Sequence, residues 1–175
     1  YFNPKLPAVS IVIDGFGDES TSSIHHLTSL QEIKHKWSSL FPNSVGLFYS
    51  AITDFLGFAV NEGEYKMMGL AAFGKPSFYE KLKKTVKFEN NELIVDTNYY
   101  DYVRRIDRSY SDLLVSLFKT KPKEPNVPLE LGTDNFQIYA DIACSAQRVL
   151  EDILFDLFSF ANEITGENKF LFSGG

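Results

Sequence analysis

Cysteine, methionine and tryptophan are scarce in this chain of 175 residues, which holds one cysteine, two methionines and one tryptophan. The single cysteine, Cys144, excludes an internal disulfide and fits a reducing compartment, so we expect a cytoplasmic protein. No apolar stretch approaches the roughly 20 residues that a membrane span needs, and we expect no membrane partner. The net charge of −6 comes without a basic stripe, which argues against nucleic acid as a partner.

Aromatic residues, in contrast, are plentiful, with 16 Phe and 9 Tyr. They provide enough bulk for one core of ordinary size and argue against disorder. The sequence ends on an apolar run that leads into a glycine pair, as a strand leads into a loop. We therefore expect residues 1–175 to be a partial domain of a larger protein.

Hydrophobic periodicity predicts an α/β fold with layers of strands and helices. Strands are expected over 8–13, 20–28 and 33–38 as a meander, over 86–88 and 93–95 as a hairpin, and over 170–172. Helices are expected over 45–56, 63–72, 77–84, 136–164 and, in two pieces, over 99–118. Ser77 and Asp134 are expected to cap the amino ends of two of these helices, and Gly166 to end the long one. Residues 119–132, with three prolines among charges, are expected to form an exposed linker or lid.

The turn after the first strand is the first candidate site. In Asp14-Gly15-Phe16-Gly17, the glycines Gly15 and Gly17 allow backbone N–H groups to approach a phosphate. A carboxylate in the same turn would repel that phosphate unless a cation lay between them. The pattern therefore favours Asp14 as a ligand of a divalent metal that also touches phosphate oxygens. The alternative is a common Asp-Gly turn in which Asp14 is only solvated.

Two further segments are candidates on weaker patterns. Gly174 and Gly175 follow the last strand, where a glycine pair can pass close beneath a nucleotide or form an ordinary turn. Glu64 and Lys66 lie between glycines in an otherwise apolar segment. Lys66 could neutralise a phosphate or other substrate oxygen, and Glu64 could orient it or a substrate hydroxyl. A surface ion pair is at least as consistent with the spacing.

The remaining chemically versatile residues favour structural roles. His25 and His26 are neighbours on a strand and point to opposite faces, so we do not expect both to bind one ion. His35 is isolated among lysines. Cys144 is expected to be a small buried residue and not a nucleophile.

Four stretches in the same order make the sequence similar to the NodU/CmcH carbamoyltransferase family. The specific one is Gly63-Glu64-Tyr65-Lys66-Met67-Met68-Gly69-Leu70-Ala71-Ala72-Phe73-Gly74. The others are residues 11–17, residues 44–51 with 56–58, and residues 140–147 with 173–175. The resemblance covers most of the chain apart from residues 78–132.

This resemblance implies the Kae1-like part of such an enzyme, an actin-like ATPase half-domain of the sugar kinase/Hsp70 superfamily, with a mixed sheet and packed helices. It implies ATP as cofactor, carbamoyl phosphate as donor, a hydroxyl of a sugar or natural product as acceptor, and a YrdC-like domain in the same parent chain. It also implies that Asp14 binds a divalent metal, Fe or Mg/Mn, together with two histidines from an upstream helix. His25 and His26 lie after the turn and do not match them, so we expect the fragment alone to be inactive.

Two alternatives stay open from the sequence. One is an ATP-dependent kinase or hydrolase of the same superfamily, which needs no YrdC-like domain. The other is a non-catalytic nucleotide-binding domain.

Overall fold

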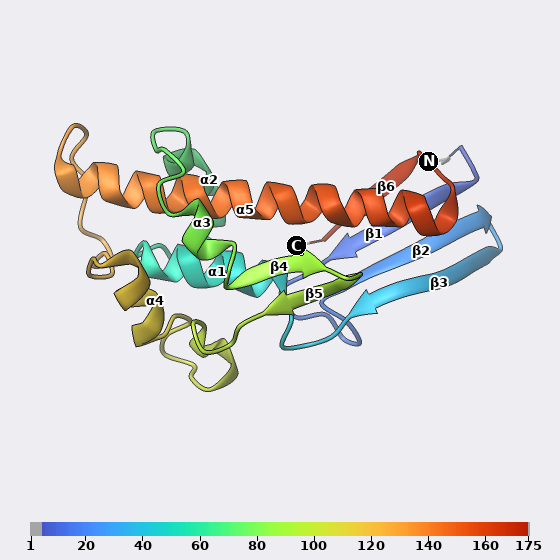
Figure 1. Cartoon of the computed structure of the whole chain (residues 1–175), viewed down its shortest axis with the longest axis horizontal. Coiled ribbons are helices and arrows are strands. Elements are labelled where there is room, and N and C mark those ends of the chain that lie inside the picture. The colour runs from blue at the N-terminus through green and yellow to red at the C-terminus, as the bar shows by residue number, and fades with distance from the viewer. Residues whose placement is uncertain (1–4, 175) are drawn as a thin grey trace.

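The computed structural model describes residues 5–174, which form an elongated molecule with a β-sheet at one end and short helices at the other (Figure 1). The main sheet holds β1 (Ala8–Ile13), β2 (Ser22–Ser29), β3 (Glu32–Ser39) and β6 (Phe170–Ser173), in the order β3-β2-β1-β6. β1 is antiparallel to β2 and parallel to β6. The expected meander, the last strand and the mixed α/β class are therefore confirmed.

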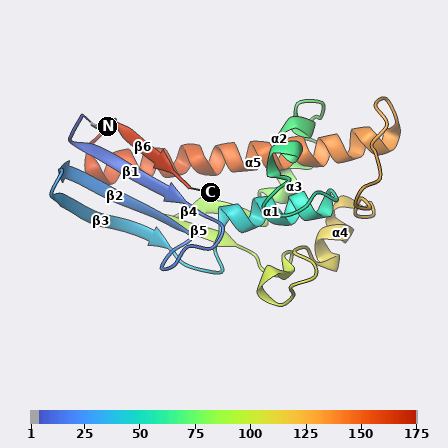
Figure 2. The same cartoon turned by 180° about the vertical axis from the view of Figure 1, so that it is seen from behind.

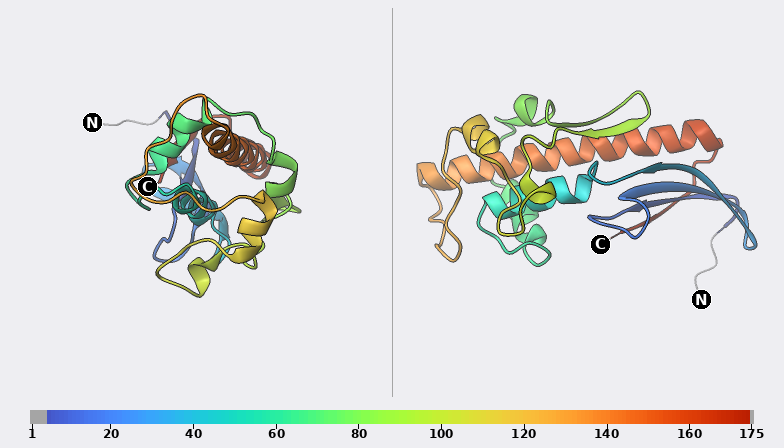
Figure 3. Two further views of the ribbon diagram at one scale, coloured as in Figure 1. Left: turned by 90° about the vertical axis from the view of Figure 1, so that its left-hand side faces the viewer. Right: turned by 90° about the horizontal axis from the view of Figure 1, so that it is seen from below.

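One long helix, α5 (Asp134–Thr165), runs the length of the molecule and covers one face of the sheet (Figures 1 and 3). Alternate residues of β1, Val9 and Ile11, are fully buried against its carboxyl-terminal half, as a period of two on the strand requires. Leu157 and Phe160 of α5 supply the other side of this small core.

The opposite end of the molecule holds the larger core, built around the amino-terminal half of α5. Around it lie α1 (Val45–Phe55), α2 (Glu64–Ala71), α3 (Tyr79–Leu82), α4 (Asp112–Phe118) and the hairpin of β4 (Val86–Glu89) with β5 (Glu92–Val95). α1 forms as its apolar spacing predicts, and Phe48, Ile52 and Phe55 are completely buried in this core. α1 also bridges the two ends of the molecule, since it starts beside the sheet and ends among the helices (Figure 2).

Two expected helix caps are wrong. Ser77 does not cap α3; its hydroxyl donates to Asp141 Oδ2 at 2.8 Å, and Phe78 occupies the cap position. Asp134 is the first residue of α5, and the preceding Thr133 accepts the capping hydrogen bond from the N–H of Phe136 at 3.2 Å. Gly166 ends α5 with a φ of 74°, as expected.

The segment 99–118 is less helical than the sequence predicts. It holds only a short 3-10 turn, Asp101–Val103, and α4, with a loop between them. Tyr100 is fully buried and pairs in a β-bridge with Tyr110, while the N–H of Ser109 donates to Asp54 of α1 at 2.7 Å. Tertiary anchoring of this kind overrides local helix propensity.

Residues 119–132, which we call the strap, have no helix or strand, as expected. The strap is mostly exposed, but Lys123 within it is buried, with 9% of its surface exposed. Among residues 5–174, no helix has the combination of length and apolarity that would let it cross a membrane.

Candidate functional site

The Asp14 turn (residues 14–17) follows β1 directly at the carboxyl edge of the sheet. The N–H of Asp14 still donates to Thr21 O at 2.8 Å, which extends the pairing of β1 with β2 by one residue. Asp14 is half-buried, and its Oδ1 accepts from the N–H of Gly15 at 2.7 Å. Within residues 5–174, Oδ2 takes no hydrogen bond, so one carboxylate oxygen is available to a ligand.

The amino end of α1 is packed onto the backbone of this turn. Ser44, the N-cap of α1, is fully buried and donates through its hydroxyl to Gly15 O at 2.8 Å while accepting from Leu47 N–H at 3.0 Å. A Cβ on Gly46 would lie 2.8 Å from both N and Cα of Gly15. The amino end of α1 therefore holds the Asp14 turn in place through contacts with the backbone of that turn, and only a glycine fits at position 46.

Sequence reasoning missed Ser44 and Gly46 as residues of the site. The signal was present: a serine that directly precedes an apolar helical pattern predicts an N-cap. What the sequence did not show is that this capping serine also contacts the Asp14 turn, because that contact joins residues 29 positions apart.

The end of β6 meets the same edge of the sheet. A Cβ on Gly174 would lie 1.7 Å from the carbonyl oxygen of Ile13, the residue before Asp14. The parallel pairing of Val12 with Ser173 brings the two strand ends together. Gly174, with a φ of 154°, thus allows the chain to pass directly beside the Asp14 turn, and Gly175 lies outside the described residues.

These three parts converge at the carboxyl edge of the sheet: the Asp14 turn, Gly174 and the amino end of α1. Open α/β sheets bind ligands at this edge, and a helix amino end offers partial positive charge to an anion. Asp14 offers a hard oxygen ligand of the kind that divalent cations prefer. Residues 5–174 contain no cluster of three or more His, Cys, Asp or Glu side chains that could hold a metal by itself.

Glu64 lies at the start of α2, away from the Asp14 turn. Its Oε1 accepts from the hydroxyl of Ser50 at 2.9 Å and from the N–H of Asn61 at 3.0 Å, and its Oε2 accepts from Gly63 N–H at 3.1 Å. Ser50 is six residues beyond Ser44, or about 9 Å along α1. Glu64 therefore stabilises the start of α2 and ties it to the middle of α1.

Lys66 is exposed, and its Nζ lies 5.7 Å from the centre of the Tyr65 ring. It lines a cavity with Gly57, at the far end of α1 from the Asp14 turn. The structure thus separates Glu64 and Lys66 from each other and from Asp14, and their catalytic roles remain predictions.

His25 and His26 lie in different surroundings, as expected for neighbours on a strand, whereas Cys144 is half-buried and not buried as predicted. His25 and His35 face each other across β2 and β3 with ring centres 5.4 Å apart, while His26 lies 3.5 Å from Glu167. Burial, together with the nearby acidic residues, raises the pKa of the half-buried Cys144 thiol. A raised pKa disfavours the thiolate, which a nucleophilic cysteine needs.

The fold and this edge define a mixed α/β domain with a glycine-rich turn that presents one carboxylate. Comparison with known proteins is more specific, since the sequence matches the family described as the carbamoyltransferase N-terminus over residues 2–175. The chain belongs to this family, and the resemblance noted from its sequence motifs is confirmed.

Three relatives illustrate the match. The chain is 33% identical, over 99% of its length, to an uncharacterised protein of Synechocystis sp., of which it covers 27%. It is 31% identical, over 94% of its length, to the nodulation protein NolNO of Sinorhizobium fredii, of which it covers 22%. It is 29% identical, over 76% of its length, to the nodulation protein NolO of Bradyrhizobium diazoefficiens, of which it covers 21%. The chain thus spans about a quarter of the length of these relatives.

Proposed function

We propose that this chain is part of an O-carbamoyltransferase that uses ATP and carbamoyl phosphate to carbamoylate a hydroxyl group of a sugar or natural-product acceptor. One observation carries the proposal. The chain belongs to the carbamoyltransferase N-terminus family, and the Asp14 turn and Gly174 converge at one edge of its sheet. In this proposal the chain is an actin-like ATPase half-domain, Kae1-like, and a YrdC-like domain of the same parent protein completes the enzyme.

The Asp14 turn supplies the ligand-binding groups in this proposal. Asp14 contributes one carboxylate ligand to a divalent cation, Fe or Mg/Mn, and the other ligands come from outside residues 5–174. Such a cation would supply Lewis-acid stabilisation of charge on a phosphate or carbamoyl oxygen. Gly15, Gly17 and Gly174 have no side chains to obstruct a nucleotide phosphate, which can then approach the backbone N–H groups.

The amino end of α1 holds this turn in place. Ser44 donates to the carbonyl of Gly15 and so fixes the backbone of the turn. Pre-set backbone N–H donors stabilise developing negative charge without reorganisation during the reaction. The chain's contribution to catalysis is thus rigid positioning of one metal ligand and of backbone donors.

The test is the substitution Asp14→Asn in the full-length protein, with Asp18→Asn as its matched control. Asp18 is an exposed carboxylate of the same loop. We expect Asp14→Asn to weaken metal binding by at least about tenfold and to remove carbamoyl-dependent release of pyrophosphate from ATP. Asp18→Asn should leave both unchanged.

Metal content measured by elemental analysis and pyrophosphate measured with labelled ATP give independent readouts. Unchanged metal affinity in Asp14→Asn would refute the metal assignment. Nucleotide hydrolysis by the unsubstituted protein that does not depend on carbamoyl phosphate would instead favour a kinase or hydrolase of the same superfamily.

A further inference from the structure

A second cavity lies at the carboxyl end of α1, remote from the Asp14 turn. It is an open cavity with a volume of about 660 Å³, lined by the residues that follow α1, by α2, by the strap and by the start of α5. This volume is in the range of small-molecule sites. Because α1 has 11 residues, its two ends lie about 16 Å apart, and this cavity is separate from the candidate site at the sheet.

The walls of the cavity combine apolar side chains with two lysines. Phe58, Phe73 and Phe136 lie among its apolar walls, and its charged residues are Lys66 and Lys123. No acidic residue among those described lines it. In a chain with 23 acidic and 17 basic residues, a cavity that holds only positive charge is unusual.

Lys123 is the more informative of the two lysines because it is buried without a carboxylate partner. Its Nζ donates to the carbonyl of Glu124 at 3.0 Å and lies 5.8 Å from the centre of the Phe58 ring. Within the described residues, no Asp or Glu oxygen lies in ion-pair distance of it. Burial lowers the pKa of Lys123, as desolvation of an ammonium group does.

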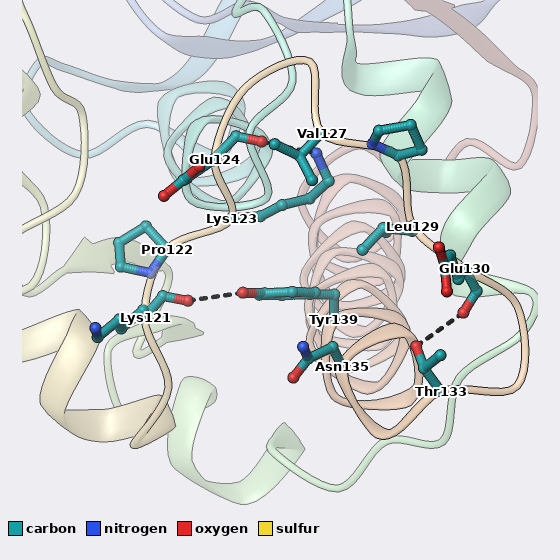
Figure 4. Close-up of a pocket in the computed structure, with 11 residues that line it drawn as sticks. Lys121, Pro122, Lys123, Glu124, Val127, Leu129, Glu130, Thr133, Asn135 and Tyr139 are labelled. Carbon is teal, nitrogen blue, oxygen red and sulfur yellow. Dashed lines mark hydrogen bonds between the residues drawn. The ribbon is translucent and has the colours of Figure 1, made fainter.

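The backbone at Lys123 contacts the carboxyl end of α1. Its N–H donates to the carbonyl of Phe55 at 2.9 Å, and a Cβ on Gly57 would lie 2.6 Å from the Lys123 carbonyl oxygen. Figure 4 shows the same stretch of strap from the neighbouring cavity, where the hydroxyl of Tyr139 donates to Lys121 O at 3.1 Å. The strap is therefore hydrogen-bonded to the rest of the molecule at Lys121 and at Lys123.

We propose that this cavity binds a small amphiphilic anion, whose carboxylate, phosphate or sulfonate head lies between Lys66 and Lys123 and whose apolar body packs on the phenylalanine walls. An anionic head would supply the counter-charge that Lys123 lacks, and charge-assisted hydrogen bonds of this kind are about twice as strong as neutral ones. An apolar body would cover the aromatic surface between α2 and α5. The inference does not depend on the proposed carbamoyl transfer, because it uses neither Asp14 nor the edge of the sheet.

The probe for this site is 8-anilinonaphthalene-1-sulfonate, compared with its neutral analogue N-phenyl-1-naphthylamine. Both report binding by fluorescence, and only the first carries the anionic head. In the full-length protein, we expect Lys123→Met to weaken binding of the sulfonate about tenfold and to change binding of the neutral analogue less than about twofold. Lys66→Met should act in the same direction by a smaller factor, because Lys66 is exposed.

Lys121→Met is the matched control, since Lys121 belongs to the same strap and lines only the neighbouring cavity, whereas Lys123 lines both. It should leave both probes unaffected. If Lys123→Met does not fold, Lys66→Met and the charge-preserving Lys123→Arg carry the test, and Lys123→Arg should keep sulfonate binding. Equal losses for both probes, or unchanged sulfonate binding in both Met variants, would overturn the proposal.

Discussion

The two ends of α1 are in contact with different parts of the molecule. At the amino end, Ser44 and Gly46 press directly on the Asp14 turn, which belongs to the sheet. At the carboxyl end, the strap packs against Gly57, and the N–H of Lys123 donates to Phe55 O. The turn that carries Asp14 thus contacts the amino end of α1, and the strap contacts the carboxyl end through the backbone of Lys123.

The difference lies in what holds each end. The amino end contacts backbone that is already hydrogen-bonded into β1 and β2, so it cannot move without disturbing the sheet. The carboxyl end contacts a segment without helix or strand, which has more freedom to adjust. We infer that the sheet end is built for fixed geometry and the strap end for accommodation of a ligand. The following predictions test this contrast, from the largest expected effect to the smallest.

Gly46→Ala should be the most destabilising of these changes. The new Cβ would meet backbone atoms of Gly15 at 2.8 Å, and neither the helix nor the strand end can move away. We expect a loss of about 2–3 kcal/mol in the free energy of unfolding, as for overpacking of a rigid core, measured by urea denaturation.

Gly69→Ala is the matched control for that change. Gly69 is also a helical glycine, but a Cβ there would meet nothing within 4 Å. Alanine should therefore stabilise α2 by about 0.5–1 kcal/mol through helix propensity. A stabilising effect of Gly46→Ala as well would show that the amino end of α1 is not held tightly against the turn.

Gly57→Ala tests the other end of α1 and should cost less. Gly57 has a φ of 69°, where alanine is strained by about 1–2 kcal/mol, and its Cβ would press on the strap. The new Cβ would lie 2.6 Å from the Lys123 carbonyl oxygen, so the strap must shift. Because the strap is a loop outside the sheet, we expect this shift to cost less than the contact at Gly46. A loss as large as that of Gly46→Ala would show that both ends are equally rigid, and would remove the contrast.

Local patterns predicted most of the fold but only parts of the candidate site. Periodicity located β1, α1 and α5, and the glycine at 166 marked the end of α5, because these signals lie within a single element. The loop between the 3-10 turn and α4 was missed, since Tyr100 is fixed by burial and not by its neighbours in the sequence. Lys123 was missed for a related reason. A lysine among prolines predicts exposure, and only the fold brings it against the end of α1.

Acidification should also lower the free energy of unfolding at different pH values through groups at the two ends of the molecule. At the sheet end, burial and then the nearby His35 lower the pKa of His25 from its ordinary value of 6.5. The unfolded chain therefore binds a proton at this histidine at a higher pH than the folded chain does. Stability must fall as the pH drops through about 6.5, and His25→Gln should flatten this part of the profile.

At the helical end, the corresponding group is Asp141 of α5. Burial acts to raise its pKa, but hydrogen bonds from Lys75 N–H, Gln137 and Ser77 outweigh it and leave the pKa lowered. A lowered carboxyl pKa gives stability that is present above the ordinary value of about 3.9 and is lost as the pH falls below it.

The two groups predict loss of stability in separate pH windows. On acidification from neutral pH, the free energy of unfolding should fall first through the sheet end near pH 6 and only below about pH 4 through Asp141. Denaturation profiles of His25→Gln and Asp141→Asn, measured from about pH 7 to 3, check this order. Asp141→Asn should show the same loss of stability near pH 6 as the unsubstituted protein. It should show a smaller loss of stability below about pH 4. A loss near pH 6 that survives in His25→Gln would assign it to another group and separate the histidine pair from the stability of the sheet.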